Sequence, residues 1–303
     1  MRKRPATNIS ASVHQRLLNR AKETEQSFNH LLQHFAMERF LYRLSKSEHA
    51  DSFILKGALM LAVWRIPQSR PTLDIDLLGR GSNNPDEMVA VTRAVCQQEV
   101  EPDGMSFDPG TVMGERIVEE AEYEGVRLRF RGSLGNAVVP MQMDVGFGDA
   151  VVPPPEMVEY PTLLDFPAPR LRGYSKESTI AEKFQAMGSR GLLTSRMKDF
   201  FDVWLLSRQS DFDGAVLAEA IQVAFARRAT PLSRASDVLT SAFAQDEVKV
   251  VQWRTFRRRV EAPESLTEVV AHLAGFLGPI AEVLSAGRPF QGTWRAPGPW
   301  LER

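Results

Sequence analysis

The sequence predicts an α+β protein, with a mixed β-sheet flanked by helices in its first half and a mostly helical second half. Residues 127–131 and 138–145 alternate in polarity or carry β-prone side chains, which is typical of strands. From residue 176 to about residue 286, apolar residues instead recur at the three- and four-residue spacing of helices. A length of 303 residues allows one large or two modest domains.

The sequence predicts helices in its first 45 residues and a mixture of helices and strands after them. Two helices are expected within residues 11–45. Further helices are expected over 53–65 and 85–99, and strands over 72–78, 127–131 and 138–145. A Gly/Ser/Asn-rich turn joins the last two strands and favours a hairpin. Helices are expected again over 176–190 and 195–207, while the last 16 residues, rich in Pro, Gly and Trp, are expected to be irregular.

A proline-rich connector, VVPPPEMVEYP, spans residues 151–161 and indicates a domain junction. We therefore expect a first domain over 1–155, containing the sheet and the N-terminal helices. The second domain, over 156–303, is expected to be helical and to complete the active-site cleft.

Composition excludes several classes of protein. The net charge is −1, so contact with nucleic acid must come from local basic patches. The single cysteine, Cys96, excludes an internal disulfide, and its helical setting favours a buried thiol over a nucleophile. No apolar run approaches the ~20 residues of a membrane span, and the N-terminus lacks the apolar core of a signal peptide. We therefore expect a cytoplasmic protein with no membrane contact.

The segment RPTLDIDLL holds the strongest functional signal. Asp74 and Asp76 alternate with Ile75 and Leu77, so a strand places both carboxylates on one face. Two adjacent like charges repel unless a cation lies between them, and a divalent metal that holds a phosphate is the usual cation. The alternative is a solvent-facing strand with two surface aspartates.

Asp144 ends a later predicted strand and supplies a third carboxylate. Neighbouring strands lie ~4.8 Å apart, so Asp74, Asp76 and Asp144 can converge on one or two Mg²⁺ or Mn²⁺ ions if their strands are close. One ion would orient a triphosphate, and the other would activate an attacking hydroxyl.

Two shorter signals precede this strand. Gly57 would let backbone N–H groups approach a phosphate at a helix N-terminus, with Lys56 adding charge. The alternative is a plain helix start with a small residue for packing. Thr72 lies two residues before Asp74, where its hydroxyl can reach phosphate or metal-bound water, or can be an ordinary strand residue.

The helical half contains a second cluster. Lys183 lies on a mostly apolar helix, and Asp202 lies within FFDVWLL, so each needs a partner. We predict a Lys183–Asp202 ion pair between adjacent helices that faces the active cleft. Lys183 would contact the triphosphate, and Asp202 would orient Lys183 or the incoming base. A purely structural salt bridge is the alternative, and Lys198 and Asp199 are either contributors or solvated.

At these residues the chain resembles the AbiEii/AbiGii family of nucleotidyltransferase-like toxins of abortive-infection and toxin–antitoxin systems. The matching segments, in the family's order, are ASVHQRLLNRAKETEQSFNHLLQHFAMERFLYRLSKS, FILKGALML, RPTLDIDLL, YSKESTIAEKFQAM and RMKDFFDVWLL. The resemblance implies a polymerase-β-like nucleotidyltransferase core and Mg²⁺-dependent transfer of a nucleotide from an NTP, with tRNA as acceptor in characterised relatives. It also implies a cognate antitoxin encoded nearby.

The resemblance assigns roles to individual residues. The family's catalytic aspartate pair corresponds to Asp74 and Asp76, and its preceding hydroxyl corresponds to Thr72. Its lysine corresponds to Lys183, and its late aspartate corresponds to Asp202. One departure is Gly57-Ala58, where the superfamily commonly has Gly-Ser or Gly-Gly, so a hydroxyl that would contact phosphate is missing.

A basic and aromatic segment is the candidate RNA surface. It runs Trp253-Arg254-Thr255-Phe256-Arg257-Arg258-Arg259, a composition suited to phosphate contact and base stacking. Arg127, Arg129 and Arg131 share one strand face and are a second candidate. For both, a solvated face or charge partners for Asp and Glu is the alternative.

Three hypotheses follow. The first is nucleotidyl transfer to RNA, acting as a toxin that blocks translation and growth. The second is a non-enzymatic nucleotide-binding module that binds an antitoxin. The third is transfer to a protein or small-molecule hydroxyl. The intact carboxylate pair favours activity, and the basic-aromatic segment favours RNA.

Overall fold

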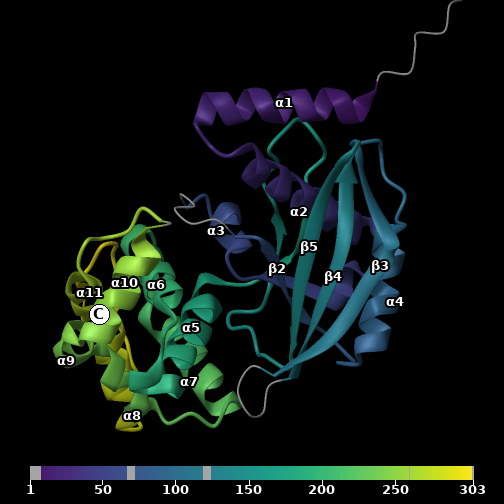
Figure 1. Ribbon diagram of the computed structural model, residues 1–303. Coiled ribbons are helices and arrows are strands. Elements are labelled where there is room, and N and C mark those ends of the chain that lie inside the picture. The colour runs from purple at the N-terminus through teal and green to yellow at the C-terminus, as the bar shows by residue number, and fades with distance from the viewer. Residues whose placement is uncertain (1–7, 67–71, 119–123, 259, 302–303) are drawn as a thin grey trace, which may run out of the picture. The chain divides into compact units, whose positions relative to one another are not determined.

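The structure is a computed structural model that describes residues 8–66, 72–118, 124–258 and 260–301 (Figure 1). The chain divides into two compact units. The first comprises the described residues of Met1–Arg65, Thr72–Gly148 and Glu156–Gly173, and the second those of Ile66–Pro71, Asp149–Pro155 and Tyr174–Arg303. This division differs from the boundary expected after residue 155, because residues 156–173 supply two strands to the sheet of the first unit.

The first unit is built on a mixed seven-stranded sheet with the order β3-β4-β5-β2-β1-β7-β6. The strands are β1 (Phe53–Lys56), β2 (Asp74–Gly79), β3 (Met105–Val118), β4 (Glu124–Leu134), β5 (Ala137–Phe147), β6 (Glu156–Glu159) and β7 (Arg170–Gly173). β2 is parallel to β5 and β1 is parallel to β7, while the other neighbours are antiparallel. The predicted hairpin is the β4–β5 pair.

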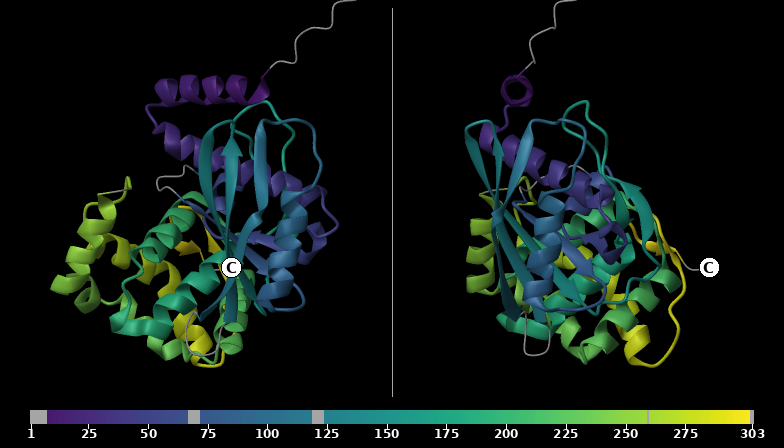
Figure 2. Two further views of the ribbon diagram at one scale, coloured as in Figure 1. Left: turned by 45° about the vertical axis from the view of Figure 1, so that its right-hand side comes forward. Right: turned by 90° about the vertical axis from the view of Figure 1, so that its right-hand side faces the viewer.

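Helices cover one face of this sheet. They are α2 (Phe28–Lys46), the short α3 (Leu59–Val63) and α4 (Pro85–Cys96), while α1 (Ile9–Thr24) packs on α2 beyond the ends of the strands (Figure 1). Figures 1 and 2 show α2 running across the sheet, and it is buried almost all round, as a core helix is. α4 packs so closely on β3 that a Cβ added at Gly114 would lie 2.7 Å from Val89. Met113 and Glu115 therefore point to the opposite face of the sheet.

The prediction of a helix over 53–65 is wrong at its start, because residues 53–56 form β1. Phe53, Ile54 and Leu55 are all buried, since β1 pairs with β2 on one side and with β7 on the other. A short, continuous apolar run is common to buried strands and buried helices, so its periodicity does not separate them. Gly57 follows with φ of +71°, which ends the strand before α3 begins.

The second unit is mostly helical, as predicted. Its helices are α5 (Lys176–Arg190), α6 (Met197–Gln209), α7 (Gly214–Arg227), α8 (Leu232–Ala235), α9 (Ser241–Gln245), α10 (Glu247–Arg257) and α11 (Leu266–Ser285). A small sheet of β8 (Phe212–Asp213), β9 (Thr293–Trp294) and β10 (Trp300–Leu301) holds the tail. The Trp294 indole N–H donates to the Ser207 carbonyl at 2.6 Å, so the tail is more ordered than its composition predicts.

α11 is long and apolar enough to cross a membrane by length and composition alone. The expectation that no segment reaches this length is therefore corrected. Its apolar face, including Leu273, Phe276 and Leu277, is buried inside the second unit, which is the setting of a core helix in a folded protein. Cys96, at the end of α4, is also buried, and burial raises the pKa of its thiol to about 12, which fits the predicted structural role.

A buried acid on α2 makes the stability of the first unit depend on pH. Glu38 is fully buried, accepts a hydrogen bond from the Leu163 N–H at 2.7 Å, and pairs with Arg39. Burial raises the pKa of Glu38 to about 7, although Arg39 opposes the shift. The folded protein therefore keeps a proton that the unfolded chain releases, and the free energy of unfolding should fall by up to about 3 kcal/mol as pH rises from 4.5 to 7.

Urea unfolding at pH 5 and pH 7.5 measures this difference for the first unit. Glu38→Gln should flatten the dependence over this window, because the amide does not titrate. Glu48→Gln is the matched control, because Glu48 lies just beyond α2 with an exposed side chain. An unchanged pH dependence in Glu38→Gln would assign the effect to other groups.

Candidate active site

One charged side chain from each of five neighbouring strands lies in a single row across the sheet of the first unit. Asp76 of β2 lies opposite Lys56 of β1 and, on its other side, opposite Asp144 of β5. Arg127 of β4 lies between Asp144 and Glu115 of β3. We call these five residues the charged row. Because adjacent strands are ~4.8 Å apart, the carboxyl groups of Asp76 and Asp144 are neighbours.

Asp74 lies on the same face, one pleat before Asp76. β2 buries Ile75 and Leu77 and leaves both aspartates half-buried, so the predicted alternation is present. Asp74 lies opposite Gln142 of β5 rather than opposite an acid. The sheet thus brings the three predicted carboxylates to one face of two parallel strands.

The third carboxylate already has a partner that the sequence did not indicate. Arg127 donates two hydrogen bonds to Asp144, from Nε at 2.8 Å and from Nη2 at 2.7 Å, one to each carboxylate oxygen. These hydrogen bonds raise the pKa of Arg127, so its guanidinium stays charged. The pair is partly exposed, with 28% of the Arg127 side chain and 18% of the Asp144 side chain accessible.

The residues fit a divalent metal by their chemistry. Carboxylate oxygens are the ligands that Mg²⁺ prefers, and Asp74, Asp76 and Asp144 supply them from one face. Among the described residues, however, no three His, Cys, Asp or Glu side chains are gathered as a ready metal site. In addition, Arg127 donates a hydrogen bond to each oxygen of Asp144. A metal that used Asp144 would therefore compete with Arg127.

Replacing Arg127 by glutamine should strengthen metal binding roughly fivefold, because it removes a competing and repelling cation from a partly exposed carboxylate. Titration with Mn²⁺, followed by electron paramagnetic resonance, measures the affinity directly. Arg131→Gln makes the same change of charge on the same strand and should leave the affinity nearly unchanged. Weaker Mn²⁺ binding in Arg127→Gln would instead mean that Arg127 holds Asp144 in its binding position.

Gly57 is packed directly against Asp76. A Cβ added at Gly57 would lie 2.1 Å from Asp76 Oδ2, and φ of +71° also disfavours any other residue there. Gly57 lies just before the N-cap of α3, Ala58, so it stands at a helix N-terminus, and this helix has five residues. Gly57 thus fixes the position of a carboxylate. A contact of Lys56 or Gly57 with phosphate stays a prediction.

Thr72 precedes β2 and does not lie within it, since the strand begins at Asp74. Its side chain is buried, and its hydroxyl donates to the Asp74 carbonyl at 3.4 Å. This contact supports the backbone of the first aspartate, and a role in phosphate or water binding stays a prediction.

In the second unit the predicted Lys183–Asp202 ion pair is present. Lys183 Nζ lies 2.7 Å from Asp202 Oδ2 and 3.0 Å from Asp199 Oδ1, so it joins α5 to two carboxylates of α6. Arg196 donates to the other oxygen of Asp199. Burial disfavours the charge on Asp199, but Lys183 and Arg196 outweigh it, so the pKa of Asp199 is lowered.

Asp199 is the member of this cluster that the sequence left open, and its fully buried side chain excludes the solvated alternative. The signal was its position three residues before Asp202, which places both acids on one helix face. Lys198 is exposed, so for this residue the solvated alternative agrees with the structure.

The segment predicted to bind RNA on α10 is only partly available. Trp253 is buried, and its ring and that of Phe201 pack against Phe256, which is itself partly exposed, so of the two aromatics in this segment only Phe256 keeps surface for stacking. Arg257 donates to the Ala262 carbonyl at 3.3 Å. Arg254 and Arg258 are exposed and stay candidates for phosphate contact, while Arg259 lies outside the described residues.

The mixed sheet with three aspartates on one face, the helical second unit and the match to a family model together place the chain in the class of nucleotidyltransferases. The family model described as nucleotidyl transferase AbiEii toxin, type IV toxin–antitoxin system, matches residues 39–274. The chain belongs to this family, and the predicted family and enzyme class are confirmed.

Two solved structures from Helicobacter pylori are similar to the chain. One is the crystal structure of JHP933, and the other is a protein provisionally assigned as a nucleotidyltransferase. Each is 15% identical, with a TM-score of 0.47, and the alignments cover 86% of this chain and 94% and 96% of the two neighbours. A search of curated proteins gives no match.

Proposed function

We propose that the protein is a Mg²⁺- or Mn²⁺-dependent toxin that transfers a nucleotide from an NTP to an RNA acceptor. Transfer RNA is the first candidate acceptor, and its modification would block translation and growth. The observation that carries the proposal is the register that sets Asp76 beside Asp144, with Asp74 on the same face. NTPs and tRNA are cytoplasmic, so we place the protein there, with an antitoxin partner that restrains it.

The chemistry is a single displacement at phosphorus. An RNA hydroxyl oxygen forms a bond to the α-phosphorus of the NTP, the bond from that phosphorus to the bridging oxygen breaks, and pyrophosphate leaves. The hydroxyl proton passes to solvent. When bound, a divalent metal would neutralise phosphate charge and lower the pKa of the hydroxyl.

The chain's own residues position these groups. Asp74, Asp76 and Asp144 would hold the metal on a rigid sheet, and Gly57 keeps Asp76 in place. Lys183 would stabilise the charge of the triphosphate, and Asp202 would orient Lys183, as in the ion pair between them.

Incubation with Mg²⁺, each α-labelled NTP and total bacterial tRNA tests the proposal. We expect label on RNA, lost in Asp74→Ala. Lys183→Ala should lose it as well, but it also leaves two buried carboxylates without their lysine, which costs about 3–5 kcal/mol. Lys183→Arg keeps the charge, and a melting curve separates lost folding from lost chemistry.

Other outcomes would redirect the proposal. Labelled protein with unlabelled RNA would support transfer to a protein hydroxyl. NTP binding with no transfer to any acceptor would support a non-enzymatic module that binds an antitoxin. Expression without a neighbouring antitoxin should arrest growth, and Asp76→Ala should relieve the arrest. Arrest that persists in this variant would separate toxicity from nucleotidyl transfer.

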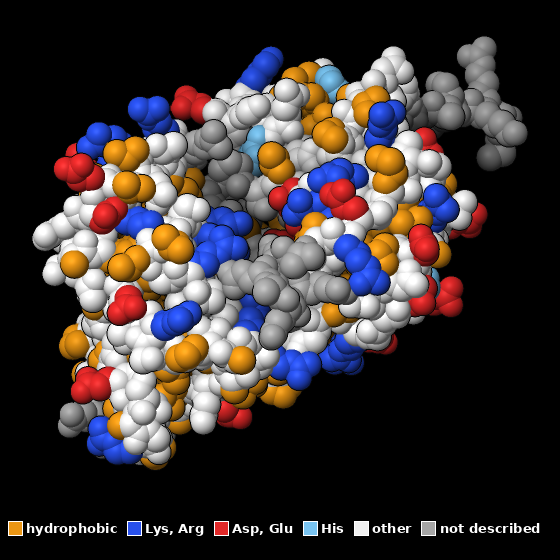
Figure 3. Space-filling model, turned by 60° about the horizontal axis from the view of Figure 1, so that its bottom comes forward, with side chains coloured by type: hydrophobic (Ala, Val, Ile, Leu, Met, Phe, Trp, Pro, Cys, Tyr) orange, Lys and Arg blue, Asp and Glu red, His pale blue; other side chains and the backbone are white. Residues whose placement is uncertain are grey.

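The face drawn in Figure 3 carries Lys and Arg side chains interspersed with acidic and apolar ones. The mixture matches the net charge of −1. RNA would therefore contact a local basic patch, because the surface as a whole is not basic.

A further inference from the structure

The two aspartates of β2 are not held equally firmly. β1 pairs with β2 only from Asp76 to Gly79, whereas β5 pairs with β2 from Asp74 onward. Asp76 therefore lies between two strands and packs against Gly57. Asp74 is the first residue of β2 and, among the described strands, is paired on one side only. Strands fray from such ends, so a metal ligand at this position needs support from other groups.

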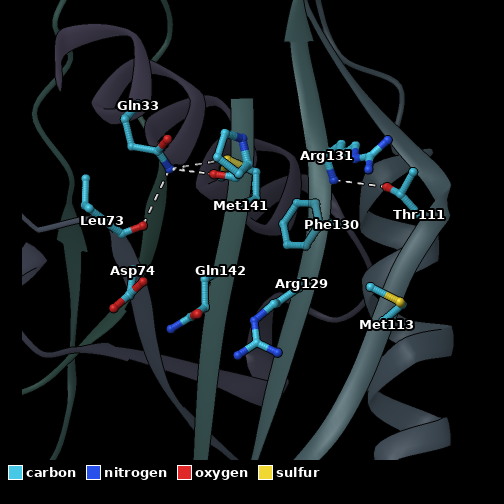
Figure 4. A pocket seen from close by; sticks show the side chains of 11 residues that line it. Gln33, Leu73, Asp74, Thr111, Met113, Arg129, Phe130, Arg131, Met141 and Gln142 are labelled. Atoms are coloured by element: carbon cyan, nitrogen blue, oxygen red, sulfur yellow. Dashed lines mark hydrogen bonds between the residues drawn. The ribbon is translucent and has the colours of Figure 1, made fainter. Parts of the chain in front are cut away.

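Gln33 of α2 supplies this support. Its side-chain Nε2 donates to the Pro140 carbonyl of β5 at 3.0 Å, and the Leu73 carbonyl lies 3.5 Å from the same nitrogen, at the outer limit of a hydrogen bond. Figure 4 shows dashed lines from Gln33 to Leu73 and to the segment at Met141, with Asp74 next to Leu73. The amide has two N–H donors, one for each carbonyl. Gln33 thus connects the residue before Asp74 to the strand that pairs with Asp74.

Pro140 explains why a side chain makes this connection. The Pro140 carbonyl accepts from the same amide that lies near Leu73, so it points toward the start of β2. In a strand, the N–H of a residue points to the same side as its carbonyl. Proline has no N–H, so β5 offers no donor here to the chain that precedes β2. In agreement, the pairing of β2 with β5 begins at Asp74 and Gln142.

The surroundings of Gln33 indicate that its loss would affect position more than folding. Gln33 is only 9% exposed, and so buried an amide is expected to form hydrogen bonds. Gln33, Leu73 and Asp74 also line a pocket of about 410 Å³. Water in this pocket can hydrogen-bond to carbonyls that lose the amide, so the fold tolerates the change. Water does not connect two strands as rigidly as one buried side chain does.

We propose that Gln33 is a positioning residue, which holds the start of β2 against β5 and thereby keeps the Asp74 carboxylate on the face that it shares with Asp76 and Asp144. The effect on catalysis rests on the proposed function, because it assumes that Asp74 is a metal ligand. Gln33 acts through the backbone of β2 and contacts neither metal nor substrate. Asp76 keeps its position without Gln33, since Gly57 and two neighbouring strands fix it.

Hydrogen–deuterium exchange followed by mass spectrometry tests the hold on β2 without metal, NTP or RNA. Gln33→Met is similar in size but lacks the amide donors. In this variant the peptide over residues 72–77 should exchange roughly fivefold faster than in wild type, while peptides of α4 exchange as in wild type. Unchanged exchange at the start of β2 would overturn the proposal. An equal increase throughout the first unit would overturn it too, because it reports a general loss of stability.

Thr92→Val is the matched control. Thr92 is a buried polar residue of α4, another helix on the same sheet, and its hydroxyl donates to the Met88 carbonyl of the same helix at 2.7 Å. This variant should leave exchange at the start of β2 unchanged. An increase there as large as in Gln33→Met would contradict the proposal, since the loss of any buried hydrogen bond would then have the same effect.

Titration with Mn²⁺, followed by electron paramagnetic resonance, extends the test to the metal site. We expect roughly tenfold weaker binding in Gln33→Met below its melting temperature, and wild-type affinity in Thr92→Val. In transfer assays, kcat of Gln33→Met should fall roughly tenfold with KM for RNA unchanged, because contacts with RNA are kept. Faster exchange with unchanged Mn²⁺ affinity would show that Gln33 has a structural role alone.

The outcomes separate this proposal from the proposed function. If wild type transfers no nucleotide, but Gln33→Met shows faster exchange and weaker Mn²⁺ binding, the proposed function fails and the positioning role stands. If wild type labels RNA, and Gln33→Met keeps the same rate, exchange and Mn²⁺ affinity, the positioning role alone fails.

Discussion

Replacing Asp76 by asparagine should lower the rate of nucleotide transfer by roughly 10³-fold or more, because the amide cannot neutralise a divalent metal at the centre of the charged row. Asparagine has nearly the same size, so the close contact with Gly57 is kept. Asp76 lies between Asp144 and Lys56, so removing its charge relieves one repulsion and loses one attraction, and the melting temperature should change little. The fold therefore survives the change, and the lost rate reports on chemistry.

Initial rates with a labelled NTP and RNA measure this effect, and Mn²⁺ titration shows whether metal binding is lost with it. Asp51→Asn is the matched control, because Asp51 is an exposed acid of the same unit that pairs with Arg172. It should react like wild type. An Asp76→Asn enzyme that keeps a tenth of the wild-type rate would remove Asp76 from the metal site.

Gly57→Ala should abolish most of the activity although Gly57 carries no functional group. Its Cβ would overlap Asp76 Oδ2, which must then move away from its position beside Asp144. The positive φ adds about 1–2 kcal/mol of backbone strain. We expect a loss of at least about 100-fold in rate, since misplacing a catalytic group by about 1 Å has effects of this size.

Gly81→Ala separates the two causes. Gly81 also has a positive φ, of +103°, but nothing lies within 4 Å of a Cβ added there. This variant should lose a similar amount of stability and keep its activity and its affinity for Mn²⁺. Equal activity losses in the two variants would show that strain, and not displacement of Asp76, causes the effect.

The parts of the fold that were predictable are those with a clear local period. The alternation around Asp76 predicted β2, and the three- and four-residue spacing of apolar residues predicted α5, which begins after the N-cap residue Ser175. β3 was missed because Pro109 and Gly110 count against a strand, and the structure accommodates them in an irregularity between Asp108 and Met113. Residue preferences along one segment do not predict such an irregularity, because pairing with the neighbouring strand stabilises it.

The candidate site divides in the same way. Asp74, Asp76 and Asp144 could be proposed from their chemistry, because acids next to apolar strand residues are conspicuous. The pairing of Asp144 with Arg127 depends on the register of β4 against β5, which the hairpin turn and packing set together. The pocket was also out of reach, since its residues come from four strands and α2.

The late strands β6 and β7 determine when the sheet of the first unit can be completed during synthesis. β1 pairs with β7, and β7 comes from residues 170–173, after the segment Asp149–Pro155 that belongs to the second unit. A growing chain, or a fragment cut at residue 155, therefore presents the buried strand β1 as an open edge, where other chains can add. Completion of the catalytic sheet must wait for residue 173, well after the last aspartate of the charged row has been synthesised.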